Sequence, residues 1–459
     1  MTSGIRPRIA PVPRVPIRLA EWARLSPEAE GPGRVLLGLS LDSYTHARAQ
    51  AETLSRAGVL EVTEFRDGLQ LAATSFVGRL AVGPLDVTIV PKISWARWLT
   101  LVGFALRLRG LLRAERLEIG TETVSLQDLV IMELLAEARD LLGRGLHREY
   151  VRRRDSLATP RGRLDFARLA RSGGIREPAL PCRFTRRSDD SPLNRALLAG
   201  LHLASGRAQD RRLQADARRL AHEMERTVVS EPLTVELLRT AYRAVDRRTR
   251  RYQAALRLIQ LLLDGQAVSL NDDPERPRVE LPGFALDMNH IWQDLLGRVL
   301  GEWSDGVDVR GEFALRGVFR RNPDHPARRN VPTPRPDFAA FRAGRLLAFL
   351  DAKYRDLWER PLPREMLYQL ALYATAQGSG AAAILYPSDS PGAVEERLDI
   401  CDPFTGTVRA TVAMRPVPLA QLERLIEAPA TSESAEQRAR FARSLLGKEG
   451  DEKHTGANR

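Results

Sequence analysis

Two short apolar runs predict a β-hairpin, and this hairpin constrains the fold of the C-terminal part of the chain. The runs are Asp337–Phe341 and Leu346–Leu350, and the segment between them contains Gly344, a residue that tight turns favour. Asp351 and Lys353 follow the second run directly. The pattern predicts a sheet that holds charged groups at the end of an otherwise apolar strand.

The pairing register of this hairpin decides which side chains meet. A three-residue loop at Ala343–Arg345 pairs Arg342 with Leu346. Asp337 then lies opposite Asp351, so the two carboxylates share a face. The lysine two positions later shares that face because side chains alternate along a strand. A two-residue loop would break this register.

Lysine is rare in this chain, which makes its place in the motif informative. Of the 70 basic residues only four are lysines, namely Lys92, Lys353, Lys448 and Lys453. Arginine is a planar cation that stays protonated, whereas lysine is a compact amine whose pKa can be lowered by burial, so Lys353 indicates a need for an amine. The alternative is a surface ion pair with Asp351 at a strand end, with Pro336-Asp337 as an ordinary turn.

The residues after the hairpin predict a helix and a second buried strand. Pro361–Ala376 has apolar residues at helical spacing, and Gln369 and Tyr373 lie four apart on one helix face. Ala381–Tyr386 is continuously apolar, which is typical of a buried strand. With a further helix that begins near Leu286, the expected order is helix, hairpin, helix, strand.

These motifs resemble those of the PD-(D/E)xK nuclease superfamily. The particular residues within the motifs resemble the McrC family, whose members are the nuclease subunits of McrBC-type 5-methylcytosine restriction systems. The motif residues are Pro336-Asp337, Asp351-Ala352-Lys353 and the Gln369 and Tyr373 pair. The resemblance extends over roughly residues 60–420 and includes Ser75–Gly78, Ile89–Ile93, Gly145–Tyr150, Arg161–Phe166 and Asn194-Arg195. It implies a multidomain α/β and α+β fold with a C-terminal α/β domain like those of restriction endonucleases.

The resemblance also implies a hydrolase that cuts phosphodiester bonds of DNA with a divalent metal ion. Asp337, Asp351 and the backbone carbonyl of Ala352 would hold Mg²⁺, which prefers oxygen ligands, and Mn²⁺ would be a substitute. The ion would stabilise charge on the phosphate and lower the pKa of the attacking water. We expect Asp351→Ala to abolish cleavage without unfolding the protein.

The remaining motif residues are expected to serve the same reaction. Lys353 would orient the attacking water or steady the developing negative charge. Gln369 and Tyr373 would position the phosphate or the lysine. The alternative for Tyr373 is a core residue with a satisfied hydroxyl.

One position departs from the family pattern. On the helix that begins near Leu286, Gln293 stands where an acid is usual. Gln293 could hold a metal-bound water, or Asp287 or Asp294 could replace the acid. The departure supports a rival from another class, a catalytically inactive activator and scaffold of an AAA+ GTPase motor. A second rival is a stand-alone DNA repair nuclease.

The charge of the chain favours a polyanionic partner. The net charge is +12, and arginines cluster at several places. A solvated surface in an arginine-rich chain explains any single cluster equally well. Double-stranded DNA, including methylated DNA, is the expected nucleic acid. Candidate contacts near the motif are Arg328, Arg329, Arg335 and Arg355.

The sequence argues against several other classes of protein. The two cysteines, Cys182 and Cys401, are too few for a disulfide framework or a structural zinc site and indicate a cytoplasmic protein. No apolar stretch reaches membrane-spanning length, so no membrane association is expected. A phosphate-binding Gly-x-x-x-x-Gly-Lys-Ser/Thr loop is also absent, so the chain itself is expected to bind no nucleotide.

The resemblance assigns the nucleotide to a partner. In McrC proteins the N-terminal part engages McrB, a hexameric AAA+ GTPase, and stimulates its GTP hydrolysis. The candidates for this contact are Lys92, Arg79, Arg97, Arg107 and Arg109, among which the sequence does not choose. For Lys92 a plain surface position is equally consistent, because Pro91 already explains the end of a strand.

Composition and periodicity divide the chain into four regions. Residues 1–115 mix short strands with a helix, and residues 116–270 are mainly helical from an N-cap at Ser125. Residues 276–427 contain the motif residues, and the resemblance implies that they form the nuclease domain. Residues 428–459 are polar and expected to be disordered, apart from a possible helix over 433–446.

Overall fold

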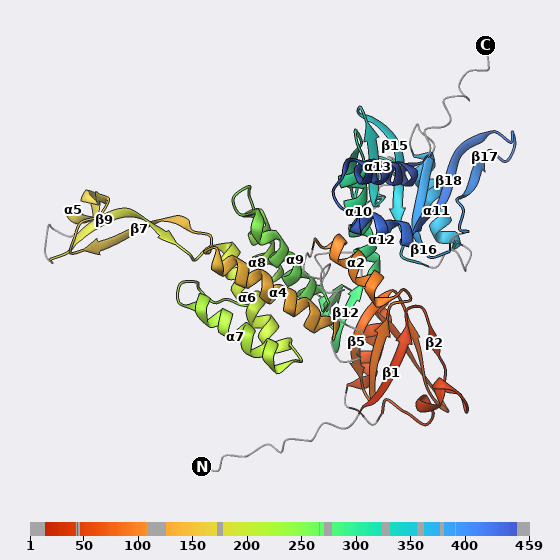
Figure 1. Cartoon of the computed structure of the whole chain (residues 1–459), viewed down its shortest axis with the longest axis horizontal. Coiled ribbons are helices and arrows are strands. Elements are labelled where there is room, and N and C mark those ends of the chain that lie inside the picture. The colour runs from red at the N-terminus through yellow and green to blue at the C-terminus, as the bar shows by residue number, and fades with distance from the viewer. Residues whose placement is uncertain are drawn as a thin grey trace. The chain divides into compact units, whose positions relative to one another are not determined.

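The structure is a computed structural model that describes residues 14–42, 44, 46–107, 125–171, 178–265, 267–269, 278–322, 331–355, 362–376, 381–390 and 392–447. These residues form two units, each of which is described by itself (Figure 1). Unit 1 combines the described residues within Met1–Leu117 with those within Ala285–Arg459, and unit 2 lies within Glu118–Phe284. Parts of the predicted N-terminal module and nuclease domain thus belong to one unit.

Two small sheets form the N-terminal part of unit 1. One has the strand order β1-β6-β5-β12 and the other β2-β4-β3. β5 and β6 are joined by a turn at Gly83-Pro84, where Gly83 has a φ of +52°. The bounds are β1 (Val15–Ala20), β2 (Arg24–Leu25), η1 (Pro32–Leu36), α1 (Ala47–Arg56), β3 (Leu60–Phe65), β4 (Gly68–Ala73), β5 (Phe76–Val82), β6 (Leu85–Val90), α2 (Trp95–Ala105) and β12 (Gly283–Asp287).

A six-stranded mixed sheet forms the core of the C-terminal part of unit 1. Its order is β13-β14-β15-β16-β18-β17, and β15, β16 and β18 run parallel. Helix α11 packs on one face, where Tyr373 joins a buried cluster with Phe349 and Ile384. The bounds are α10 (Met288–Trp303), β13 (Asp308–Gly311), β14 (Phe338–Arg342), β15 (Arg345–Ala352), α11 (Arg364–Thr375), β16 (Ala381–Ser388), β17 (Glu396–Cys401), β18 (Val408–Pro418), α12 (Leu419–Glu427) and α13 (Ser432–Leu446).

The turn between β14 and β15 corrects one prediction. Arg342 pairs with Arg345, so the turn contains two residues, and the predicted three-residue loop was wrong. Ala343 and Gly344 have φ values of +48° and +78°, as the two central residues of a type I′ turn require. This turn was not predicted because alanine, which stands at position 343, rarely adopts a positive φ.

A β-bulge restores the register that the shorter turn would have broken. Ala340 pairs with Ala348, which leaves Leu347 without a partner on β14. The extra residue shifts the pairing by one position. Continued by one pair beyond the strand, this register brings Asp337 opposite Asp351. The predicted pairing of Asp337 with Asp351 is therefore present, but it results from a two-residue turn and a bulge instead of a three-residue loop.

The C-terminal tail contains the helix that the sequence allowed as a possibility over residues 433–446. Ser432–Leu446 forms helix α13, which contacts α10 and buries Phe441 and Leu445. The guanidinium of Arg415, on β18, donates to the backbone carbonyl of Leu445. The structure therefore has a helix where the sequence allowed one as a possibility, and a few apolar side chains on one face of this helix bind it to the domain.

Unit 2 is mainly helical, as predicted, but it also contains a long β-hairpin that was not predicted. β7 pairs with β9 over nine residue pairs, and Figure 1 shows the two strands extending away from the bundle that contains α4, α6 and α9, with α5 beside their outer end. Most side chains in the middle of both strands are exposed, so no apolar alternation marks them. The bounds are α4 (Leu126–Gly143), β7 (Glu149–Leu157), β8 (Arg163–Leu164), α5 (Phe166–Arg171), β9 (Leu180–Ser188), α6 (Pro192–Arg207), α7 (Arg211–Glu225), α8 (Val235–Arg243), η2 (Arg250–Tyr252), α9 (Gln253–Asp264), β10 (Ala267–Ser269) and β11 (Arg278–Glu280).

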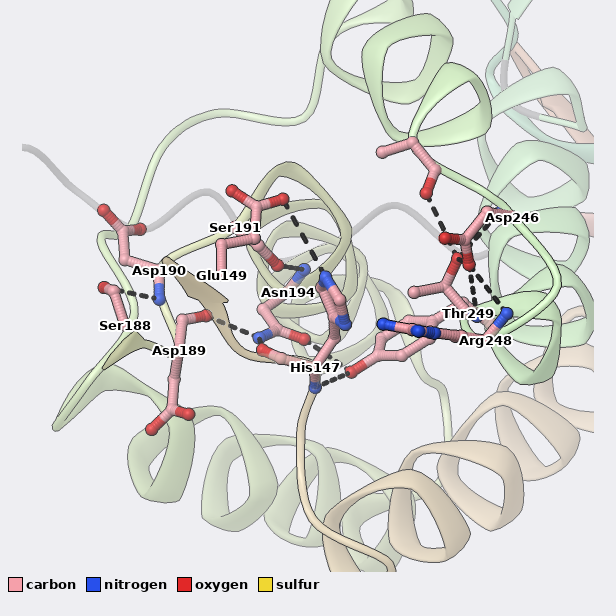
Figure 2. Close-up of polar contacts among 12 residues, drawn as sticks. His147, Glu149, Ser188, Asp189, Asp190, Ser191, Asn194, Asp246, Arg248 and Thr249 are labelled. Carbon is pink, nitrogen blue, oxygen red and sulfur yellow. Dashed lines mark hydrogen bonds and ion pairs between the residues drawn. The ribbon is translucent and has the colours of Figure 1, made fainter. Parts of the chain in front are cut away.

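Asn194 anchors the base of this hairpin (Figure 2). Its amide donates to the carbonyl of His147 at 2.8 Å and to that of Asp189 at 2.5 Å, one before β7 and the other after β9. The hydroxyl of Tyr252 donates to Asn194 Oδ1 at 2.6 Å and accepts from the His147 N–H at 2.8 Å. Asn194 and Tyr252 are fully buried, so this network supports unit 2 from inside.

Two further observations concern the whole described chain. None of its helices in the described ranges is both long and apolar enough to cross a membrane. Cys182 is buried, Cys401 is exposed, and both are free thiols.

Candidate active site

Three charged side chains meet at the C-terminal end of β15. Lys353 Nζ lies 2.9 Å from Asp351 Oδ2. The backbone N–H of Ala352 donates to Asp337 Oδ2 at 2.7 Å, so the two segments of the hairpin are tied together at this point. The structure thus brings together Asp337, Asp351 and Lys353, the set that the sequence singled out.

An inner strand holds Asp351 in place. β15 lies between β14 and β16, and Asp351 pairs with Ile384 of β16. Phe349 packs edge-on against Tyr373 of α11, and alternation along the strand directs Asp351 to the same face. The side chain of Asp351 is only 4% exposed, against 26% for Lys353. A carboxylate buried to this extent requires charged or hydrogen-bonding partners, and Lys353 is one of them.

The site has the electrostatics of crowded carboxylates. Burial and then the neighbouring Asp351 carboxylate raise the pKa of Asp337 to about 6, although the Ala352 N–H and Lys353 act in the opposite direction. Burial alone would lower the pKa of Lys353, but Asp351 and Asp337 outweigh it, and the pKa is raised. The lysine is therefore a cation at neutral pH, and the sequence argument for a lowered amine pKa is wrong in this structure.

Gln369 and Tyr373 interact with each other, as their helical spacing indicated. Gln369 Nε2 donates to the hydroxyl of Tyr373 at 2.6 Å, and this hydroxyl donates to the backbone carbonyl of Arg335 at 3.1 Å. Arg335 stands two residues before Asp337, so the pair supports the loop that carries this carboxylate. Burial raises the pKa of the Tyr373 phenol, which remains a neutral donor at neutral pH.

The donor set is compatible with a hard divalent cation such as Mg²⁺. The buried carboxylate of Asp351 and the half-buried one of Asp337 lie on one face, and the pKa of Asp337 is raised by burial and by the negative charge of Asp351, which a cation would offset. Within the described ranges no cluster of three or more His, Cys, Asp or Glu side chains could hold a metal. Waters, a backbone carbonyl and substrate oxygens would therefore complete the shell, as is usual for Mg²⁺.

At position 293 this chain has a glutamine where an acid is usual in the family. Gln293 is half-buried on α10, and in the described part of the chain no hydrogen bond joins it to Asp337, Asp351 or Lys353. Asp287 serves a different purpose, because its carboxylate accepts from the Asn289 N–H and caps α10. It also accepts from the hydroxyl of Ser75 at 3.3 Å.

The basic residues singled out from the sequence have varied surroundings. Arg328 and Arg329 lie outside the described residues. Arg335 is exposed, whereas Arg355 is half-buried and stacks its guanidinium 5.6 Å from the ring centre of Trp22. Lys92 is exposed at the end of β6. Arg79 is bound to the carboxylate of Asp86, with its Nε 2.7 Å from Oδ1.

Comparison with known proteins places this architecture in a family. The sequence model of the McrBC 5-methylcytosine restriction system component family matches residues 71–387, which include all of unit 2 and about half of unit 1. The chain belongs to this family. No curated protein matches the sequence. The match includes the β14–β15 hairpin, α11 and almost all of β16, so the McrBC family resemblance covers the candidate site.

Solved structures show a related fold. A chain in a refined half-complex from a tetradecameric assembly of Thermococcus gammatolerans McrB AAA+ hexamers with bound McrC has a TM-score of 0.56 and 17% identity, with 94% of this chain and 100% of that chain covered. A chain in a cryo-EM structure of the Thermococcus gammatolerans McrBC complex has 17% identity and a TM-score of 0.44, with 62% and 87% covered. At this identity, the first likeness supports a shared fold and nothing finer.

Sequence reasoning missed residues that border the site from the N-terminal part of unit 1. The hydroxyl of Tyr354, next to Lys353, donates to the buried carboxylate of Glu21 at 2.9 Å. These residues are 333 positions apart, so no local period connects them. Two signals were available, an acid at the end of the apolar strand Val15–Ala20 and a tyrosine directly after the lysine of the motif.

Proposed function

We propose that this McrBC family member is the DNA endonuclease subunit of a GTP-dependent restriction complex. It would hydrolyse phosphodiester bonds with Mg²⁺ in a domain of the PD-(D/E)xK type. The observation that supports this most is the convergence of Asp337, Asp351 and Lys353 at the end of a buried β-hairpin. A structural ion pair would need only Asp351 and Lys353. Asp337 adds a second carboxylate, which places two negative charges close together.

Each residue has a definite task in this proposal. Asp337 and Asp351, with the carbonyl of Ala352, would hold the cation, which supplies charge at the phosphate and a lower pKa for the attacking water. Lys353 stays protonated beside Asp351 and presents N–H donors to the substrate side, where it can stabilise negative charge that develops on the phosphate. The burial of Asp351 would strengthen its attraction for the cation, because charges interact more strongly where the local dielectric constant is low.

Gln369 and Tyr373 would act by positioning. The Tyr373 hydroxyl fixes the backbone at Arg335, and Gln369 fixes the Tyr373 hydroxyl. This chain of two hydrogen bonds holds the segment before Asp337, so the carboxylate keeps its place when substrate binds. The exposed end of Gln369 also leaves it accessible to a phosphate.

The partner in this proposal is a hexameric AAA+ GTPase of the McrB type. Its support is the family membership and the likeness in fold to a chain from an assembly of McrB hexamers with bound McrC. The chain would stimulate the partner's GTP hydrolysis through its N-terminal part, with Lys92 and Arg79 as candidate contacts. The substrate would be double-stranded DNA, including methylated DNA, bound with help from Arg335 and Arg355, in the cytoplasm.

The test is a cleavage assay in which one component is omitted at a time. The purified chain and its co-purified GTPase are incubated with methylated or unmethylated plasmid DNA, Mg²⁺ and GTP. We expect cutting only when chain, partner, GTP and Mg²⁺ are all present. Cutting without the partner or GTP would instead identify a stand-alone nuclease.

One observation favours a second candidate, an activator whose nuclease fold is inactive. Gln293 replaces a usual acid and has no hydrogen bond to the carboxylates among the described residues. In that case the chain would stimulate GTP hydrolysis, and no DNA would be cut with Mg²⁺ or Mn²⁺. A Gln293→Glu variant that gains cleavage would support the same conclusion.

A further inference from the structure

The turn that follows β1 reaches the segment that carries Lys353. Glu21 is fully buried, and its Oε2 accepts from the hydroxyl of Tyr354 at 2.9 Å. Trp22, the next residue, lies beneath the guanidinium of Arg355, 5.6 Å from its ring centre. Two consecutive residues of the N-terminal part thus contact the two residues that directly follow the candidate catalytic lysine.

The turn itself is held rigidly. The Glu21 N–H donates to the carbonyl of Val90 at 3.0 Å, and the Trp22 N–H donates to that of Thr74 at 3.2 Å. Trp22 has a φ of +59°, a conformation that costs free energy for a bulky residue and persists only where the surroundings fix it. The contacts with Tyr354 and Arg355 therefore come from a fixed support.

The backbone of Lys353 is anchored from the other side. Its N–H donates to the carbonyl of Leu385 at 3.0 Å, and the indole of Trp292 donates to the same carbonyl at 3.1 Å. The rings of Trp292 and Tyr354 lie 6.3 Å apart. The side chains of these two neighbouring residues reach different surroundings, because Lys353 Nζ contacts Asp351 while the Tyr354 hydroxyl donates to Glu21.

We propose that Glu21, through Tyr354, is a positioning residue for Lys353, so that the N-terminal part of this chain completes the nuclease site of the C-terminal part. The inference rests on the proposed function for its effect on cleavage. A shift of the β1 and β6 ends would pass to Lys353 through one hydrogen bond and one stacked cation. A partner that engages Lys92, at the end of β6, would act on the same support.

The chemical state of Glu21 fits a positioning role. Burial raises its pKa to about 8, and the hydrogen bond from Tyr354 and the interactions with Lys92 offset only part of this rise. The carboxyl is therefore largely protonated at neutral pH. Its Oε1 has no hydrogen-bond partner within the described part of the chain. Such an acid is costly to bury, so its place beside Tyr354 fits a use other than stability.

The activity test compares variants that differ in a single hydrogen bond. Tyr354→Phe removes only the donor hydroxyl, and Glu21→Leu removes the acceptor. We expect each to lower kcat about tenfold with the KM for DNA unchanged, whereas Glu21→Gln, which retains an acceptor, keeps most of the activity. Tyr386→Phe is the matched control, because it removes a buried hydroxyl of the same sheet. Wild-type kcat in both Tyr354→Phe and Glu21→Leu would overturn the inference.

A second readout does not depend on cleavage. Hydrogen exchange of the full-length chain, followed by mass spectrometry, measures protection of the Lys353 amide that donates to Leu385. We expect Tyr354→Phe and Glu21→Leu to increase exchange in the peptide that contains Lys353, and Tyr386→Phe and Glu21→Gln to leave it unchanged. Unchanged exchange in the first two variants would refute the positioning role. Increased exchange in a chain that never cuts DNA would refute the proposed function while keeping this inference.

Discussion

The buried carboxyl of Glu21 predicts how the stability of unit 1 depends on pH. Its pKa is about 8 in the folded chain, against an ordinary value of 4.5, so the folded state binds more protons than the unfolded state between these values. The contribution of Glu21 to the stability of the folded chain is therefore fully present at or below pH 4.5 and is lost as the pH rises to about 8. Tyr354 and Lys92 are the ionisable groups that act on Glu21, and both are included in this shift.

The size of the effect follows from the pKa difference. Each pKa unit corresponds to about 1.4 kcal/mol, so the ionisation of Glu21 destabilises the folded chain by at most about 5 kcal/mol above pH 8. Glu21→Gln resembles the protonated acid and cannot ionise. We expect the wild type and Glu21→Gln to have similar stability near pH 5. Near pH 8.5 we expect the variant to be more stable by up to about 5 kcal/mol.

Urea unfolding followed by tryptophan fluorescence at pH 5 to 9 measures this difference. All six tryptophans of the chain lie in the ranges of unit 1, so the signal reports on the unit that contains Glu21. Asp337, whose pKa is raised to about 6, contributes a decrease of the same sign at lower pH, but it is present in both proteins and cancels in the comparison. Parallel stability curves over the whole range would refute the assignment of a buried, largely protonated Glu21.

Three further predictions concern the candidate site and unit 2. Tyr373→Phe leaves the Arg335 carbonyl without its donor and should lower cleavage about three- to tenfold, as measured by single-turnover rates against Tyr386→Phe. Lys353→Arg keeps the charge in a planar fork and should lower the same rate at least about 100-fold; a rate within a few-fold of wild type would contradict a role for the amine. Asn194→Ala deprives two partly buried carbonyls of a donor and the buried Tyr252 hydroxyl of its acceptor, and should destabilise unit 2 by about 2–4 kcal/mol, measured by urea unfolding followed by circular dichroism; an unchanged midpoint would show that the network is dispensable.

The candidate site could be predicted from the sequence because its parts are local. Asp337, Asp351 and Lys353 lie on one hairpin, and the period of a strand decides their faces. The details of the hairpin were less accessible. The turn depends on a positive φ at Ala343, and the bulge at Leu347 has no marker residue, so two compensating irregularities gave the expected pairing.

Features that depend on distant residues or on exposed strands could not be predicted. β7 and β9 display mostly polar residues on both faces, so the period-2 signal of a half-buried strand is missing. The contact of Glu21 with Tyr354 joins residues 333 positions apart. The helix over Ser432–Leu446 was expected only as a possibility, because its burial rests on few apolar side chains, such as Phe441 and Leu445.

The central claim is that Asp351 belongs to a metal-dependent nuclease site. The most direct measurement is the rate of Mg²⁺-dependent DNA cleavage by the chain with its GTPase partner, compared between wild type and Asp351→Asn. Asp399→Asn, an exposed substitution on β17 of the same sheet, is the matched control. We predict that Asp351→Asn loses at least about 1,000-fold in rate while the control and the stimulated GTP hydrolysis remain at wild-type levels. Cleavage by a folded Asp351→Asn chain at the wild-type rate would contradict the account.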